Sequence, residues 1–122
     1  MPAAALLLIT YLGTASFILD IGGMRILTDP GDFFTARFTA AKARDVRDID
    51  LVLITHGDFD HVNRLTHVPG SEHIIVLAPE TVKNRMPSHN VSTDAEYIRG
   101  DVRVGLSVRY TAYSTTRNTG GI

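Results

Sequence analysis

Residues 51–61 read Leu51-Val-Leu-Ile-Thr-His-Gly-Asp-Phe-Asp-His61. The first five residues are apolar or β-branched and predict a short buried strand. Four side chains that can ligate a metal follow within the next six residues: His56, Asp58, Asp60 and His61. Gly57 lets the backbone turn sharply among them. Because imidazole and carboxylate are common nitrogen and oxygen ligands of zinc, manganese and iron, we predict a metal site at the end of this strand.

The same residues have a second interpretation, in which an Asp- and Gly-rich polar turn is followed by a helix that the histidines cap. A lone His-x-Asp would favour that simpler interpretation. Four potential ligands at positions i, i+2, i+4 and i+5, directly after a buried strand, are much more specific. The spacing therefore favours the metal site.

The segment Thr55–His61 resembles the His-x-His-x-Asp-His signature of the metallo-β-lactamase-fold hydrolases. The resemblance implies that His56 and Asp58 hold one ion, and that Asp60 and His61 hold a second. It also implies a catalytic role for Asp60, which would orient the attacking water. This chain has Asp58 where the signature has its middle histidine. Carboxylate is a harder ligand than imidazole, so manganese or iron becomes more favourable relative to zinc.

The N-terminal third predicts strands separated by small residues, over Ala5–Leu12, Phe17–Ile21 and Met24–Thr28. Gly22-Gly23 is a two-residue hairpin signal. The block Thr10–Pro30 resembles the opening hairpin of the same family, and it is most similar to the branch that contains the ascorbate-6-phosphate lactonase-like proteins. Many members of that branch carry a histidine where this chain has Thr14.

Asp29, in the Asp-Pro-Gly sequence that ends the third predicted strand, is a further candidate. The Asp-Pro of the resembled branch lies near its site, which implies that Asp29 contacts a metal ligand or the substrate. The simpler interpretation is a turn residue whose side chain bonds its own backbone. The sequence leaves both interpretations open.

The rest of the chain predicts short elements: helical turns in Thr39–Val46, a helix over His61–His67, a strand over His73–Leu77, a helix from Pro79 to about Met86, a loop over Pro87–Asp94, and a hairpin with its turn at Arg99-Gly100-Asp101. From Val102 to Ala112 apolar residues alternate with polar ones, which is typical of a strand with one buried face. The fold class is therefore α/β, or α+β.

The resemblance implies that residues 1–122 form a single partial domain, the N-terminal half of an αββα sandwich with a mixed sheet and short outer helices. Family members complete the site with a later histidine, a bridging aspartate and a final histidine. The nearest position for the first is Ser114, which is a poor ligand and is not assigned. We expect the other two beyond Ile122, in a protein that is cut at its C-terminal end.

Composition limits the function further. The chain has 122 residues, 44% of them hydrophobic, and a formal charge of −1, which suits one soluble globular domain. The near-neutral charge argues against nucleic acid and anionic membranes as partners. The chain has no cysteine, which excludes disulfides and thiolate zinc sites and is compatible with the cytoplasm. We expect the apolar segment Met1–Leu12 to be a buried strand rather than a signal peptide, because no basic residue precedes it.

The combined hypothesis is a metal-dependent hydrolase in which two divalent ions activate water to attack a small-molecule ester, lactone or phosphoester. The alternative is a non-catalytic or vestigial module that self-associates into a homo-oligomer through an exposed sheet. A nuclease is less favoured, because the chain shows no basic patch.

Overall fold

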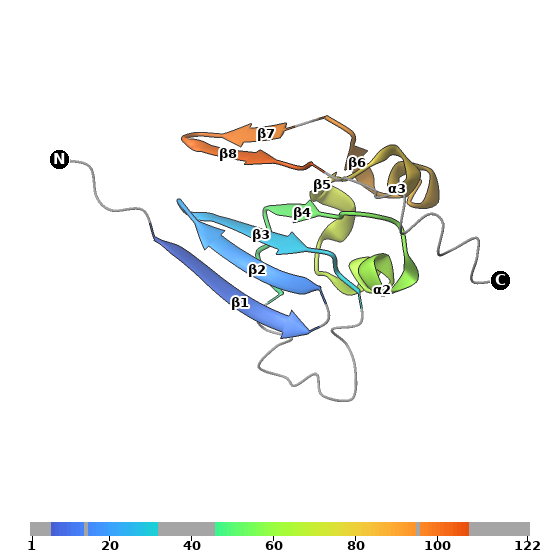
Figure 1. Ribbon diagram of the computed structural model, residues 1–122, viewed down its shortest axis with the longest axis horizontal. Helices are drawn as coiled ribbons and strands as arrows, with labels where there is room; N and C mark the ends of the chain where they lie inside the picture. Colours follow the sequence, from blue (N-terminus) through green and yellow to red (C-terminus); the bar gives the residue numbers. More distant parts are fainter. Residues whose placement is uncertain (1–5, 14, 32–45, 95, 108–122) are drawn as a thin grey trace, which may run out of the picture.

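The computed structural model describes residues 6–13, 15–31, 46–94 and 96–107 (Figure 1). Six strands form one sheet in sequence order: β1 (Leu7–Gly13), β2 (Ser16–Ile21), β3 (Met24–Thr28), β4 (Leu51–Leu53), β5 (Ile75–Leu77) and β6 (Asn90–Ser92). Two more strands form a separate hairpin: β7 (Glu96–Arg99) and β8 (Val102–Gly105). The helices are short: α2 (Phe59–Val62), α3 (Glu80–Arg85) and the 3-10 helices η1 (Leu65–His67) and η2 (Ser71–His73).

The sheet is mixed. Strands β1, β2 and β3 form an antiparallel meander, whereas β3, β4, β5 and β6 run parallel. Gly22 and Gly23 join β2 to β3 with φ values of +58° and +76°, which glycine adopts without steric cost. The parallel strands end at the same edge of the sheet, so Asp29 after β3 lies beside the segment that follows β4. This carboxyl edge is where open α/β sheets bind their ligands.

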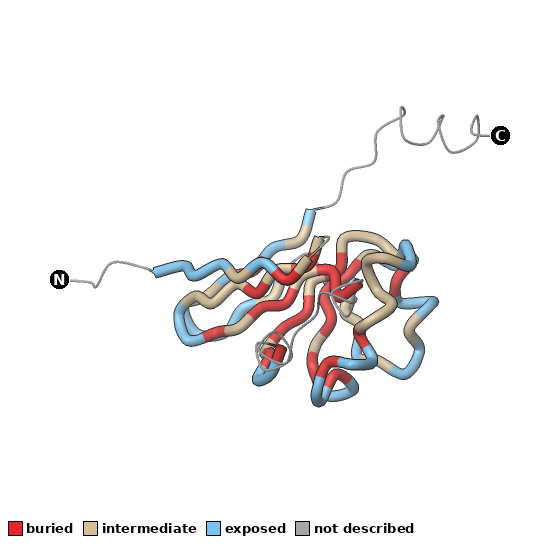
Figure 2. Tube along the Cα trace, turned by 90° about the horizontal axis from the view of Figure 1, so that it is seen from below, coloured by how far each residue is buried: buried red, intermediate tan, exposed pale blue. Residues whose placement is uncertain are grey.

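The two faces of the sheet are covered by different layers. On one face, residues of the strands pack with residues of η1 and α3, in a core that includes Leu12, Ile18, Leu27, Val52, Ile54, Leu65, Val76 and Val82. On the other face, the β7–β8 hairpin packs on the strands, with Met24, Ile26, Leu51, Leu77 and Val104 buried between them. Figure 2 shows these buried segments in red through the middle of the molecule. The layers confirm the α/β class and agree with half of a sandwich.

The predicted strands and the hairpin near residue 100 are confirmed, with small shifts at their ends. The alternation after Val102 holds as far as Ser107, with Val104 buried and its neighbours exposed. Residues 108–112 and Ser114 lie outside the described residues, as does Thr39–Val46 except for Val46 itself.

Four local predictions are wrong. The first strand is present as β1 but is not buried, because it lies at the edge of the sheet and Leu7, Leu8 and Ile9 are about half exposed. Asn90–Ser92 is not loop but β6, because it pairs in parallel with β5 although it lacks an apolar pattern. His73 does not open a strand, since it ends η2, which follows Gly70 at φ +74°. The helix predicted to begin at His61 begins at Phe59 and ends at Val62.

No helix in the described ranges is long and apolar enough to cross a membrane.

Candidate metal centre

The predicted ligands lie in the segment that leaves the carboxyl edge of β4. The Ile54 N–H donates to the Leu77 carbonyl at 3.0 Å, and thus extends the contact of β4 with β5. Helix α2 begins five residues later, with Asp58 as its N-cap. The Asp58 side chain makes no capping hydrogen bond, so its carboxylate is available for other contacts.

The four predicted ligands come together as two His–Asp pairs. His56 Nε2 lies 3.2 Å from Asp58 Oδ2, and His61 Nε2 lies 3.7 Å from Asp60 Oδ1. The two imidazole rings are neighbours, with 4.0 Å between their centroids and a 46° angle between their planes. The pairs predicted from the sequence are therefore the pairs that the fold places together.

Asp29 lies behind these pairs and is almost fully buried. Its Oδ1 accepts the Thr55 N–H at 2.7 Å, and its Oδ2 accepts the Thr55 hydroxyl at 2.9 Å. The same Oδ2 lies 3.1 Å from His61 Nδ1. The Asp29 side chain thus reaches Thr55 and His61, and among the described residues its hydrogen bonds go to Thr55 and not to its own turn. That Asp29 contacts a metal ligand or the substrate stays a prediction.

The backbone of Asp29 is held in an uncommon conformation. Its φ is +38°, in the left-handed region that non-glycine residues rarely adopt. Two contacts hold it there: the Asp29 N–H donates to the Leu53 carbonyl at 2.7 Å, and the Ser16 hydroxyl donates to the Asp29 carbonyl. A residue keeps such a strained conformation only where surrounding contacts hold it, as these hydrogen bonds hold Asp29.

The donor atoms of the two His–Asp pairs meet part of what a divalent cation requires. Two donors of a tetrahedral ion with bonds of roughly 2.0–2.1 Å lie about 3.4 Å apart, close to the separations within the two His–Asp pairs. His61 Nδ1 is a buried polar atom that is near Asp29 but not aligned for a hydrogen bond. Among the described residues, however, no three His, Asp or Glu side chains converge on one point. Each pair therefore fits part of a coordination shell.

Two residues that the sequence did not single out shape this site. At Gly31, a Cβ would lie 1.5 Å from the Asp60 carbonyl oxygen, so only glycine permits this approach of the Asp-Pro-Gly turn to α2. From α3, Arg85 Nη1 donates to the Gly57 carbonyl at 2.6 Å. Gly31 could have been suspected from its turn sequence, but nothing in the local pattern around Arg85 indicates its contact.

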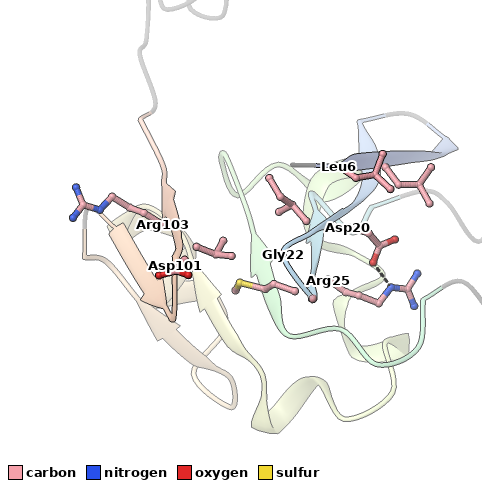
Figure 3. A pocket seen from close by; sticks show the side chains of 11 residues that line it. Leu6, Asp20, Gly22, Arg25, Asp101 and Arg103 are labelled. Atoms are coloured by element: carbon pink, nitrogen blue, oxygen red, sulfur yellow. Dashed lines mark hydrogen bonds and ion pairs between the residues drawn. The ribbon is translucent and has the colours of Figure 1, made fainter. Parts of the chain in front are cut away.

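A large groove lies at the opposite end of the sheet, between the β2–β3 turn and the β7–β8 turn (Figure 3). Its volume is about 890 Å³, and apolar side chains such as Leu6, Met24 and Val102 contribute most of its lining. Asp20 and Arg25 form an ion pair of 2.9 Å at its rim. The groove is distinct from the candidate metal centre, because Gly22-Gly23 is at the amino end of β3 and Asp29 follows its carboxyl end.

The chain resembles known proteins along most of its length. The sequence model of the Beta-lactamase superfamily domain matches residues 8–118. A UPF0173 metal-dependent hydrolase from Pyrococcus abyssi is 40% identical over 100 residues, covering 81% of this chain and 40% of the relative. Another from Pelotomaculum thermopropionicum is 31% identical over 93 residues, covering 75% and 39%. A third, from Methanopyrus kandleri, is 48% identical over 54 residues, covering 44% and 23%.

A crystal structure of a protein from Parabacteroides distasonis, provisionally described as a metal-dependent hydrolase, shares the fold. Its TM-score is 0.56 at 22% identity, over 75% of this chain and 39% of that one. The chain spans between about a fifth and two fifths of the length of the curated relatives it matches. With the mixed sheet and the motif after β4, the match over residues 8–118 shows that this chain belongs to the beta-lactamase superfamily.

Proposed function

We propose that the protein is a metal-dependent hydrolase that acts on a small-molecule ester, lactone or phosphoester. The observation that carries the proposal is the pair of His–Asp contacts, side by side at the carboxyl edge of β4. The names of the relatives, which are metal-dependent hydrolases, support it. The lactonase-like branch is supported by the resemblance of residues 10–30, and a cytoplasmic location by the absence of cysteine.

In this proposal, His56 and Asp58 hold one divalent ion, and Asp60 and His61 hold the other. The ions are zinc, or manganese or iron because Asp58 supplies a carboxylate. When bound, such ions lower the pKa of a coordinated water towards neutrality and polarise the substrate oxygen. The remaining ligands come from water or from residues outside the described ranges.

The side chains of this chain have separate tasks in the reaction. The Asp60 carboxylate is half exposed, so it can orient an incoming water while its other oxygen stays near His61. Asp29 Oδ2 lies 3.1 Å from Nδ1 of His61 and accepts the Thr55 hydroxyl, whose oxygen lies 2.9 Å from Nδ1 of His56. Asp29 and Thr55 thus position the two imidazole rings. Orienting contacts of this kind commonly contribute 10–100-fold, as an order of magnitude, to metal affinity.

The experiment has two readouts on the full protein. Metal binding is measured by titration with Zn²⁺, Mn²⁺ and Fe²⁺, and hydrolysis with a panel of lactones, carboxylic esters and phosphodiesters. We expect Asp60→Ala to weaken metal binding and to abolish hydrolysis, whereas Asp94→Ala, which changes an exposed carboxylate after β6, should change neither. Undiminished turnover by Asp60→Ala would refute the proposal.

A second candidate function is a non-catalytic module that self-associates. One observation favours it: within the described residues, each prospective ion has only two protein donors. If the protein binds none of the three metals in the titration, this candidate replaces the hydrolase.

A further inference from the structure

Helix α3 contacts the motif after β4 through its last residue, Arg85. The helix follows β5, which runs parallel to β4, so α3 and the motif lie at the same end of the sheet (Figure 1). From there Arg85 Nη1 donates to the Gly57 carbonyl at 2.6 Å, across 28 positions of the chain. A hydrogen bond from a charged donor is stronger than one between neutral groups. The contact is therefore well suited to fix the backbone at Gly57.

The Arg85 side chain also packs against Gly57. A Cβ added to Gly57 would lie 3.4 Å from Arg85 Cδ, 3.5 Å from its Nη1 and 3.7 Å from its Nε, which are ordinary van der Waals distances. A side chain longer than that of alanine would therefore compete with Arg85 for space. The φ of Gly57 is outside the left-handed region, so the backbone conformation does not by itself require glycine. What glycine provides at this position is room for Arg85.

Gly57 separates His56 from Asp58, the two predicted ligands of the first ion. The Asp58 carbonyl accepts the His61 N–H at 2.9 Å, which fixes the backbone on one side of Gly57. The hydrogen bond from Arg85 fixes it at Gly57 itself. Arg85 thus acts on the part of the backbone that sets the 3.2 Å separation between His56 Nε2 and Asp58 Oδ2.

We propose that Arg85 is a positioning residue of the candidate metal centre. By holding the Gly57 carbonyl, it keeps His56 and Asp58 at a separation at which both can bind one divalent ion. The inference rests on the proposed function, in which these two residues hold the first ion. A positive charge near a cation site weakens metal binding, because like charges repel. Arg85 can therefore favour metal binding through its hydrogen bond but not through its charge, and the two effects have opposite signs.

The first test is the metal affinity of the full protein, titrated with Zn²⁺ and Mn²⁺. Arg85→Met keeps an apolar stem but removes the donors and the charge. We expect the affinity to fall about tenfold, the lower end of the usual effect of removing a group that orients a ligand. Loss of the charge alone would raise the affinity. The control is Lys83→Met, which removes the same charge from another exposed position of α3 and should not weaken binding.

The second test asks whether Arg85 acts through the His56–Asp58 pair. Asp58→Ala removes one ligand of the first ion. In that background, Arg85→Met should lower the remaining metal affinity by roughly twofold or less, because two changes at one site are not additive. Arg85→Lys keeps the charge, but its ammonium ends one bond short of the Nη1 position. It should weaken binding less than Arg85→Met, and it takes the place of that variant if Arg85→Met fails to fold.

The third test needs no metal. Order parameters from ¹⁵N relaxation measure the picosecond-to-nanosecond mobility of backbone amides. In the metal-free protein, Arg85→Met should lower the order parameters of Gly57 and Asp58, whereas Lys83→Met should not. The midpoint of urea denaturation should stay nearly constant in both variants. A merely structural role of Arg85 would move this midpoint and leave the local order parameters unchanged.

Failure of this inference can be told apart from failure of the proposed function. If the unsubstituted protein binds neither metal, the proposed function fails, and the order parameters still decide whether Arg85 positions the backbone. If it binds metal, equal or tighter binding by Arg85→Met would overturn the inference alone. An equal loss of affinity in Lys83→Met, or unchanged order parameters of Gly57 and Asp58 in Arg85→Met, would overturn it as well.

Discussion

The buried carboxylate of Asp29 holds Thr55 at two points, through the Thr55 N–H at 2.7 Å and the Thr55 hydroxyl at 2.9 Å. The two residues are 26 positions apart in the chain, and they join the end of β3 to the end of β4. Thr55 precedes His56, and its hydroxyl oxygen lies 2.9 Å from His56 Nδ1. Asp29 therefore contacts His61 directly and is linked to His56 through Thr55.

Asp29→Asn should weaken this link, because an amide cannot accept hydrogen bonds through both of its heteroatoms. We expect a loss of about 1–3 kcal/mol in the free energy of unfolding, as when a buried group is left without its partner. Metal affinity should fall by about 10–100-fold. Urea denaturation and metal titration measure the two effects. The control is Asp20→Asn, which breaks a partly exposed ion pair with Arg25 and should cost no more than about 1 kcal/mol.

Gly31→Ala should displace the Asp-Pro-Gly turn from α2, because the new Cβ would overlap the Asp60 carbonyl group. Overpacking of this kind typically costs about 1–3 kcal/mol. We expect lower thermal stability together with weaker metal binding, since Asp60 and His61 would move with the start of α2. Gly70→Ala is the comparison: its φ of +74° also strains a side chain, but no atom of the described residues lies within 4 Å of its Cβ. Gly70→Ala should therefore lower stability without an effect on metal affinity.

Asp58→His tests the choice of metal. The substitution replaces a hard carboxylate with imidazole next to His56, and imidazole is better suited to zinc. We expect the ratio of zinc affinity to manganese affinity to rise about tenfold. Competition titrations with both ions measure the ratio. An unchanged ratio would mean that Asp58 does not coordinate the ion.

Asp50 makes stability depend on pH. Burial alone would raise its pKa, but hydrogen bonds from the Arg25 N–H and the Arg99 guanidinium, with the charges of both arginines, hold the pKa below its usual value of 3.8. The unfolded chain then binds a proton more readily than the folded one. The contribution of Asp50 to the free energy of unfolding is therefore complete above about pH 4. It is lost as the pH falls through the lowered pKa of Asp50.

The variant Asp50→Asn should be less stable than the natural protein at pH 6, by about 1 kcal/mol or less because the Arg99–Asp50 pair is partly exposed. The difference should shrink as the pH falls from 4 to 3. Urea denaturation of both proteins at pH 6, pH 4 and pH 3 measures this difference in stability. A difference that is constant with pH would contradict the assignment.

Local sequence was sufficient for the elements whose signals lie within a few residues. The apolar run of β4, the Gly22-Gly23 turn and the alternation along β8 each predict their structure, because backbone conformation responds to neighbouring side chains. The resemblance of residues 55–61 to the family signature implied the pairing of His56 with Asp58 and of Asp60 with His61, and the structure places each pair in contact. The superfamily could be suspected from the same residues, and the comparison with known proteins confirms it.

Tertiary structure alone decided the contacts between distant segments. Strand β6 has no pattern of its own and exists because β5 offers it an edge. Asp29 reaches Thr55, and Arg85 reaches Gly57 across 28 positions, because parallel strands bring their carboxyl ends and the following loops to one side of the sheet. The sequence thus determined which groups are candidate metal ligands. The strand order determined which distant groups contact them, since no local pattern encodes the order in which strands pair.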